Sequence, residues 1–256
     1  MSQALRVPTR RRPGGGTGVL VLAAVAWVGL WLWTTGPPGS VPHPAGGHDH
    51  HAPAAVGFGV YLAGWTLMLV AMMLPTTRPL MVLFAATVRD RPDRTRLLLA
   101  AGAGYLGVWL LTGLAAYAGD TVLGALVGVS PWVTDRPWLL VGGAVALAGG
   151  YQFVPMKLRC LEKCRSPRMF LFARWRGGRA ALDAIRLGAA HGRFCVGCCW
   201  ALMLVMLAAG LHSLLPMAGL AVLMGVEKNA SWGARIREPV GFLLLGVAAL
   251  VIVLQH

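Results

Sequence analysis

The stretch VLVLAAVAWVGLWLW, residues 19–33, is an uninterrupted apolar run with tryptophans at its end. Comparable runs of roughly 15 to 25 residues recur along the chain, and runs of this length cross the hydrocarbon core of a bilayer. The composition agrees, because 57% of the residues are hydrophobic and only 12% are charged. The mean hydropathy is +0.65. The sequence therefore predicts an all-α, polytopic transmembrane helix bundle that contacts the lipid bilayer.

The apolar runs predict about seven spans. The first run has the features of a signal-peptide core or of an uncleaved anchor, and the lack of a convincing cleavage site after it favours the anchor. Cleavage would leave six spans. The sixth run is short, which indicates a tilted or partly re-entrant helix. The expected spans are residues 19–33, 58–77, 97–118, 138–156, 190–211, 214–226 and 239–254.

The positions of Lys and Arg predict the orientation. With the N-terminus inside, 22 of the 23 basic residues fall in cytoplasmic segments, and only Arg136 lies outside. Basic residues accumulate on the cytoplasmic side of membrane proteins, so we expect N-in, C-out. The net charge of +14 is spread over every inner segment rather than gathered in one patch, which argues against a nucleic-acid partner. The Ala-, Gly- and Arg-rich composition indicates a multi-pass protein of the bacterial plasma membrane.

These patterns divide the chain into four parts. The long basic segment at 157–186 is expected to form an amphipathic or interfacial helix pair inside the last part. The expected parts are a basic cytoplasmic tail (1–18), a first transmembrane helix or signal anchor (19–33), a His-rich outer loop (34–57) and a metal-binding transmembrane bundle (58–254).

The five cysteines form two clusters at the predicted cytoplasmic face. Residues four apart share one face of a helix, and this spacing separates Cys160 from Cys164 and Cys195 from Cys199. His191 lies one turn before the second cluster. Thiolate and imidazole ligands suit Cu(I), or Zn(II) where four ligands close the shell. We therefore expect a copper or zinc ion bound by His191 and the cysteines, which are Cys160, Cys164, Cys195, Cys198 and Cys199.

Two further groups extend this metal hypothesis. Met72 lies near the inner end of the second span with Met68 and Met73, just before Pro75, so Met72 is a candidate thioether ligand. A proline inside a membrane helix frees a backbone carbonyl, an arrangement common where a helix lines a site. The outer loop is a candidate capture site for Cu(II), Zn(II) or Ni(II). Its residues are His43, His48, Asp49, His50 and His51.

Simpler interpretations stay open for each group. Membrane cysteines act as small apolar packing residues, methionines at helical spacing fill cores, and the loop histidines are incidental in a Gly/Pro-rich linker. Glu227 and Lys228 at the end of the sixth span are expected to pair with each other or with basic loops.

The motifs together resemble a bacterial family described as predicted metal-binding integral membrane proteins, a domain of unknown function with paired motifs CLxxC and CxGCCW. The resemblance covers roughly residues 58–250. It implies a multi-span bundle with a cysteine-based metal site. The motifs that carry it are AMMLPTTRP (71–79), YQFVPMKLRCLEKCRSP (151–167), HGRFCVGCCWALM (191–203) and EK (227–228).

We therefore expect a soft-metal handling protein for copper or zinc that acts in transport, delivery to a protein partner, or homeostasis. One alternative is a membrane thiol-disulfide oxidoreductase that uses the C-x-x-C at 195–198, although a cytosolic location keeps thiols reduced. Another is a purely structural zinc site. The sequence has no ATP-binding motif, hydrolase triad or phosphate-binding loop, so we assign no enzyme activity.

Overall fold

The computed structural model describes residues 16–35, 54–128, 132, 136, 138–209 and 214–254. Within these residues all regular secondary structure is helical, which confirms the all-α prediction. The elements are α1 (Gly16–Thr35), α2 (Ala54–Met72), η1 (Pro75–Thr77), α3 (Arg78–Thr87), α4 (Arg94–Gly128), α6 (Trp138–Tyr151), α7 (Pro155–Arg165), α8 (Pro167–Arg174), α9 (Ala180–Ala209), α10 (Leu214–Asn229) and α11 (Arg237–Leu254).

Several helices are long and apolar enough to cross a membrane. Four satisfy this alone: α1, α4, α9 and α11. Up to six spans result if each of two bent pairs counts as one span, namely α2 with η1 and α3, bent by 41°, and α6 with α7, bent by 69°. Helix α10 has only 16 residues. Each predicted run overlaps a helix, while the count of seven spans and the orientation stay predictions.

Two helices extend beyond their predicted bounds. The fifth run was expected to begin at residue 190, but α9 begins at Ala180 and takes in the end of the segment expected to form an interfacial helix pair. Its first turns are rich in alanine and leucine, which favour helix. Helix α4 continues to Gly128, past the expected end at residue 118. The segment 157–186 therefore contains a shorter helix pair than expected, α7 and α8, followed by the start of α9.

Helices α4 and α9 approach each other closely because glycines face the partner backbone. A Cβ atom at Gly188 would lie 1.8 Å from the carbonyl oxygen of Ala101, and one at Gly104 would lie 2.2 Å from that of Ile185. Small residues permit such backbone contact between membrane helices. The contact sets Tyr105 of α4 beside the cysteines of α9.

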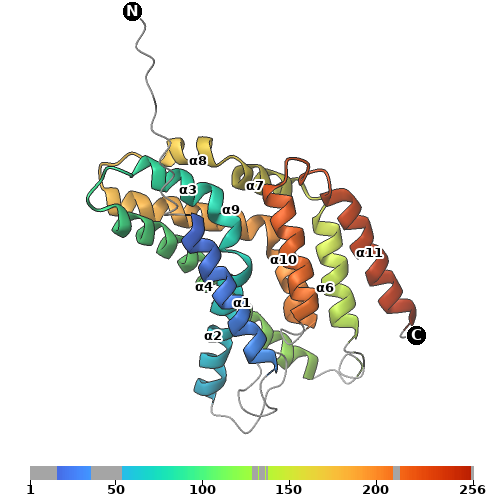
Figure 1. Cartoon of the computed structure of the whole chain (residues 1–256). Helices are drawn as coiled ribbons and strands as arrows, with labels where there is room; N and C mark the ends of the chain where they lie inside the picture. Colours follow the sequence, from blue (N-terminus) through green and yellow to red (C-terminus); the bar gives the residue numbers. More distant parts are fainter. Residues whose placement is uncertain are drawn as a thin grey trace, which may run out of the picture.

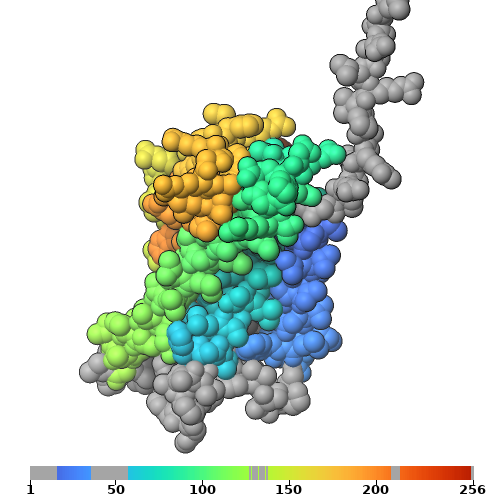
Figure 2. Space-filling view, turned by 90° about the vertical axis from the view of Figure 1, so that its left-hand side faces the viewer, coloured from blue at the N-terminus to red at the C-terminus, as the bar shows by residue number. Residues whose placement is uncertain are grey.

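The segments rich in basic residues gather at one end of the molecule. Figure 1 shows the turn between α3 and α4, the helices α7 and α8, and the turn between α10 and α11 together at the top. Figure 2 shows α8 and the start of α9 covering this end above α4, while α1 and α2 lie beside α4 below. Helix α11 buries only 11% of its apolar window, as expected for a helix that faces lipid.

Candidate metal centre

Met73 lies directly before the break that follows α2. Pro75 lacks an N–H and ends the regular helix, and the N–H of Leu74 bonds to the carbonyl of Leu69 five residues back, at 3.1 Å. The carbonyl of Met73 then accepts the hydroxyl of Thr76 at 2.8 Å. Met73 is fully buried. Its side chain therefore enters the interior of the bundle at the bend.

The second cysteine cluster lies on one buried turn of α9. Cys195, Cys198 and Cys199 are each 1% exposed. The thiols of Cys198 and Cys199 donate to the carbonyl of Cys195, at 3.1 and 2.9 Å. The Sγ of Cys199 lies 3.9 Å from the Sδ of Met73. A thiol of α9 and the thioether after α2 thus face each other.

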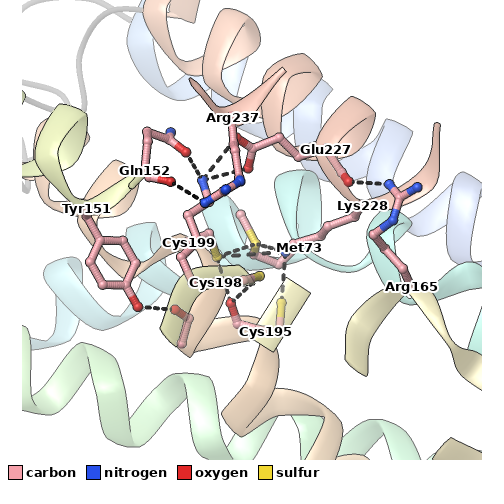
Figure 3. Close-up of polar contacts among 12 residues, drawn as sticks. Met73, Tyr151, Gln152, Arg165, Cys195, Cys198, Cys199, Glu227, Lys228 and Arg237 are labelled. Carbon is pink, nitrogen blue, oxygen red and sulfur yellow. Dashed lines mark hydrogen bonds and ion pairs between the residues drawn. The ribbon is translucent and has the colours of Figure 1, made fainter. Parts of the chain in front are cut away.

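Lys228, in the last turn of α10, reaches into this group of sulfur atoms (Figure 3). Its Nζ lies 3.0 Å from the Sγ of Cys195. The same atom lies 3.7 Å from the Sγ of Cys199 and 3.7 Å from the Sδ of Met73. Three sulfur atoms from two separate segments therefore converge on one buried amine.

Tyr105 of α4 closes the group from another side. Its hydroxyl lies 3.1 Å from the Sγ of Cys195. It also donates to the carbonyl of Met73 at 3.3 Å. Tyr105 thereby connects α4, α9 and the bend after α2, and it holds the sulfur atoms in a water-poor interior.

The two predicted cysteine clusters do come together. Cys160 and Cys164 on α7 pack against the buried core cluster that contains Cys195, Cys198 and Cys199. The Sγ of Cys160 packs over Gly197, where an added Cβ would lie 2.7 Å away. A glycine at this position lets α7 approach α9.

The donor set differs from the one expected from the sequence. Among the described residues, no group of three or more His, Cys, Asp and Glu side chains has the arrangement of a metal site. The convergent atoms are instead two thiols, one thioether and one amine. A set of soft sulfur atoms around a single position suits a monovalent soft ion such as Cu(I) better than Zn(II), which requires four ligands.

Two candidate ligands lie beside the group of sulfur atoms. Met72 is buried in the same apolar core, but the Sδ next to Cys199 belongs to Met73. The His191 ring packs against Tyr105 and Phe170 with centroid distances of 5.8 and 5.5 Å. The His191 Nδ1 is buried without a hydrogen-bond partner.

A small cavity adjoins this histidine. It has a volume of about 20 Å³, and its lining includes Leu74, Thr77, Tyr105 and His191. A cavity of that size holds about one water molecule. It extends from the bend after α2 to the ring of His191, one turn before Cys195.

A buried ion pair holds the end of α10. The Nζ of Lys157 lies 2.8 Å from a carboxylate oxygen of Glu227, and it also donates to the side chain of Gln152. Arg165 donates to the backbone carbonyl of Glu227 at 2.6 Å. The expected pairing of Glu227 with a basic segment is therefore present, whereas its neighbour Lys228 turns to the sulfur atoms.

Sequence reasoning did not identify Tyr105 or Lys228 as part of the site. A lysine at the end of an apolar run indicates only a membrane boundary, and a tyrosine within a span carries no metal-ligand pattern. The candidate outer capture residues lie outside the described part of the chain; they are His43, His48, Asp49, His50 and His51.

Comparison with known families identifies the group to which the chain belongs. Residues 62–251 match the model of PpoB2, a family described as copper chaperones. The protein is a member of the PpoB2 copper chaperone family. This agrees with the metal-related family that the sequence motifs indicated. No curated protein and no solved structure matches the chain. The matched region of this PpoB2 family member includes Met73, Cys195 and Cys199, whose sulfur atoms converge on Lys228.

Proposed function

We propose that this protein is an integral membrane copper chaperone that binds Cu(I) at a buried sulfur site and delivers it to a protein partner. Copper is then its cargo rather than a resident cofactor. The observation that carries the proposal is the convergence of the sulfur atoms of Cys195, Cys199 and Met73 within 3.0–3.7 Å of one point. Membership of the PpoB2 family favours copper over zinc.

The second group of thiols supports delivery by ligand exchange. Cys164 packs against the buried core cluster that contains Cys195, Cys198 and Cys199. Cys164 is partly exposed and lies on the short helix α7. Because soft ions exchange between neighbouring thiolates, Cys198 and Cys164 provide a route from the buried site toward the surface where a partner would dock. Cys160 lies beside the same route.

The predicted orientation places this end of the bundle at the cytoplasmic face of the bacterial plasma membrane. The thiols would then lie in a reducing compartment, where they remain available for metal. The oxidoreductase and structural-zinc alternatives make different predictions about metal content and disulfide state.

The test is metal content measured by mass spectrometry on detergent-purified protein, prepared under reducing conditions and loaded with Cu(I) or with Zn(II). We expect about one Cu(I) per chain, retained against a chelator, and strongly reduced retention in Cys195→Ser and Cys199→Ser. Unchanged copper content in both variants would contradict the ligand assignment. In protein purified without reductant, a metal-free state with a Cys195–Cys198 disulfide would favour the oxidoreductase, and tight zinc without copper would favour the structural site.

A further inference from the structure

The amine of Lys228 occupies the position on which the sulfur atoms converge. Its Nζ is 3.0 Å from the Sγ of Cys195 and 3.7 Å from both the Sγ of Cys199 and the Sδ of Met73. Figure 3 shows the side chain extended toward these atoms from the end of α10. A cation that is attracted by sulfur therefore already lies where a soft metal ion would be bound.

The acidic side chain next to Lys228 does not balance this amine. Glu227 faces away and is paired with Lys157, which is itself 1% exposed. Lysine is rarely buried unless it is paired. Here the hydrogen-bond acceptors of the buried Nζ are sulfur atoms, so its burial depends on the same atoms that would ligate copper.

We propose that the Lys228 amine is an internal competitor of Cu(I): it withdraws from the sulfur atoms when the ion binds and returns when the ion leaves. This inference rests on the proposed copper-binding function and adds a release device to it. Metal–sulfur bonds are about 2.3 Å long, so the ion would take the space of the amine, and two cations at one point repel each other strongly in a low dielectric.

The surroundings of Lys228 allow the side chain to move while the helix stays in place. The end of α10 is held by the Lys157–Glu227 pair and by Arg165, which donates to the carbonyl of Glu227. The four-carbon stem of lysine is flexible. Asn229, Ser231 and Trp232 are exposed in the turn that follows, and the displaced amine would move toward this turn.

The competition has a quantitative consequence for copper handling. The apparent affinity for Cu(I) equals the intrinsic affinity multiplied by the fraction of molecules in which the amine has withdrawn, so a small withdrawn fraction weakens binding. When a partner thiol begins to take the ion, the returning amine fills the vacated position. Lys228 thus weakens retention and accelerates release, which suits a delivery protein better than a storage protein.

The test compares Lys228→Leu and Lys228→Gln with the wild type. Lys163→Gln is the matched control, since it removes a lysine charge from an exposed position on α7. Copper affinity is measured by competition with a colorimetric Cu(I) chelator, and release is measured by stopped-flow transfer to excess chelator. We expect about tenfold tighter binding and correspondingly slower release in both Lys228 variants, a difference of about 1.4 kcal/mol, and no change in the control.

Unchanged or faster release in the Lys228 variants would overturn the inference, because the amine would then be neutral toward copper or would help to hold it. Wild-type protein that takes up no Cu(I) would refute the proposed function instead. A second measurement uses the wild type alone, so it does not depend on how the variants fold. Acylation of Lys228 by a small amine-reactive reagent should increase on Cu(I) loading relative to acylation of Lys157 and Lys163. An unchanged ratio of Lys228 acylation to that of the other two lysines would overturn the inference.

Discussion

Met72 and Met73 are neighbours in the chain with different surroundings. Both are buried, but it is the Sδ of Met73 that lies 3.9 Å from the Cys199 thiol. We expect Met73→Leu to weaken Cu(I) affinity by about tenfold, because leucine lacks the soft thioether ligand. A tenfold change corresponds to about 1.4 kcal/mol of binding free energy. Chelator competition on the purified protein measures the effect.

Met72→Leu is the matched control for this prediction. Met-to-Leu exchange conserves volume and costs less than about 1.5 kcal/mol of stability, so both variants should fold. Equal losses of affinity in the two variants, or a larger loss in Met72→Leu, would return Met72 to the site.

The single residues of the site also mark the limit of sequence reasoning. The cysteines and the methionine patch were recognisable because their spacing is local. The spacing of four between Met68 and Met72 indicated a shared face, and the structure buries both of them together with Met73. Which of these thioethers meets the Cys199 thiol depends on tertiary packing against α9. The contact of Lys228 with Cys195 could not be predicted from the sequence, because the two residues are distant in the chain and only tertiary packing brings them together.

At the scale of the elements, the contact between α4 and α9 depends on glycine. A Cβ at Gly188 would lie 1.8 Å from the carbonyl oxygen of Ala101, so Gly188→Ala must push the helices apart. We expect a loss of stability of about 1–3 kcal/mol, as for other overpacked interiors. We also expect weaker Cu(I) binding, since Tyr105 would move away from Cys195. Thermal unfolding in detergent and chelator competition are the measurements.

Gly107→Ala on α4 is the control for this prediction, because an added Cβ there meets no atom within 4 Å. Alanine is the better helix former by about 1 kcal/mol, so this variant should be at least as stable as the wild type. Equal melting temperatures for the Gly188 and Gly107 variants would show that the close approach of α4 and α9 is not required.

The element boundaries show a similar division between local and tertiary information. Pro75 was expected to remove a helix hydrogen bond, and the structure bends there by 41°, whereas the 69° bend at Pro155 falls inside the expected span 138–156 and was not predicted. The early start of α9 could not be predicted from hydropathy alone. Its first turns carry charged residues such as Asp183, so they fall outside the apolar run, although their alanines and leucines favour helix.

At the scale of the whole molecule, the bundle has one basic end. The distribution of Lys and Arg predicted that the inner segments share one side, and Figure 1 shows those described by the structure gathered at one end. This agreement supports the assumption behind the predicted orientation. The sulfur site lies near the same end, since Lys228 belongs to the last turn of α10.

The lysines offer a direct test of the orientation. The chain has three, of which Lys157 and Lys228 are buried and Lys163 is exposed on α7 at the basic end. A membrane-impermeant, amine-reactive reagent should therefore modify Lys163 in inside-out vesicles and leave it unmodified in intact spheroplasts, as quantified by peptide mass spectrometry. Detergent-solubilised protein is the positive control and Lys163→Gln the negative one. Modification in intact spheroplasts would place the thiols on the oxidising side, where a disulfide at residues 195–198 becomes stable, and would favour thiol-disulfide exchange over copper delivery.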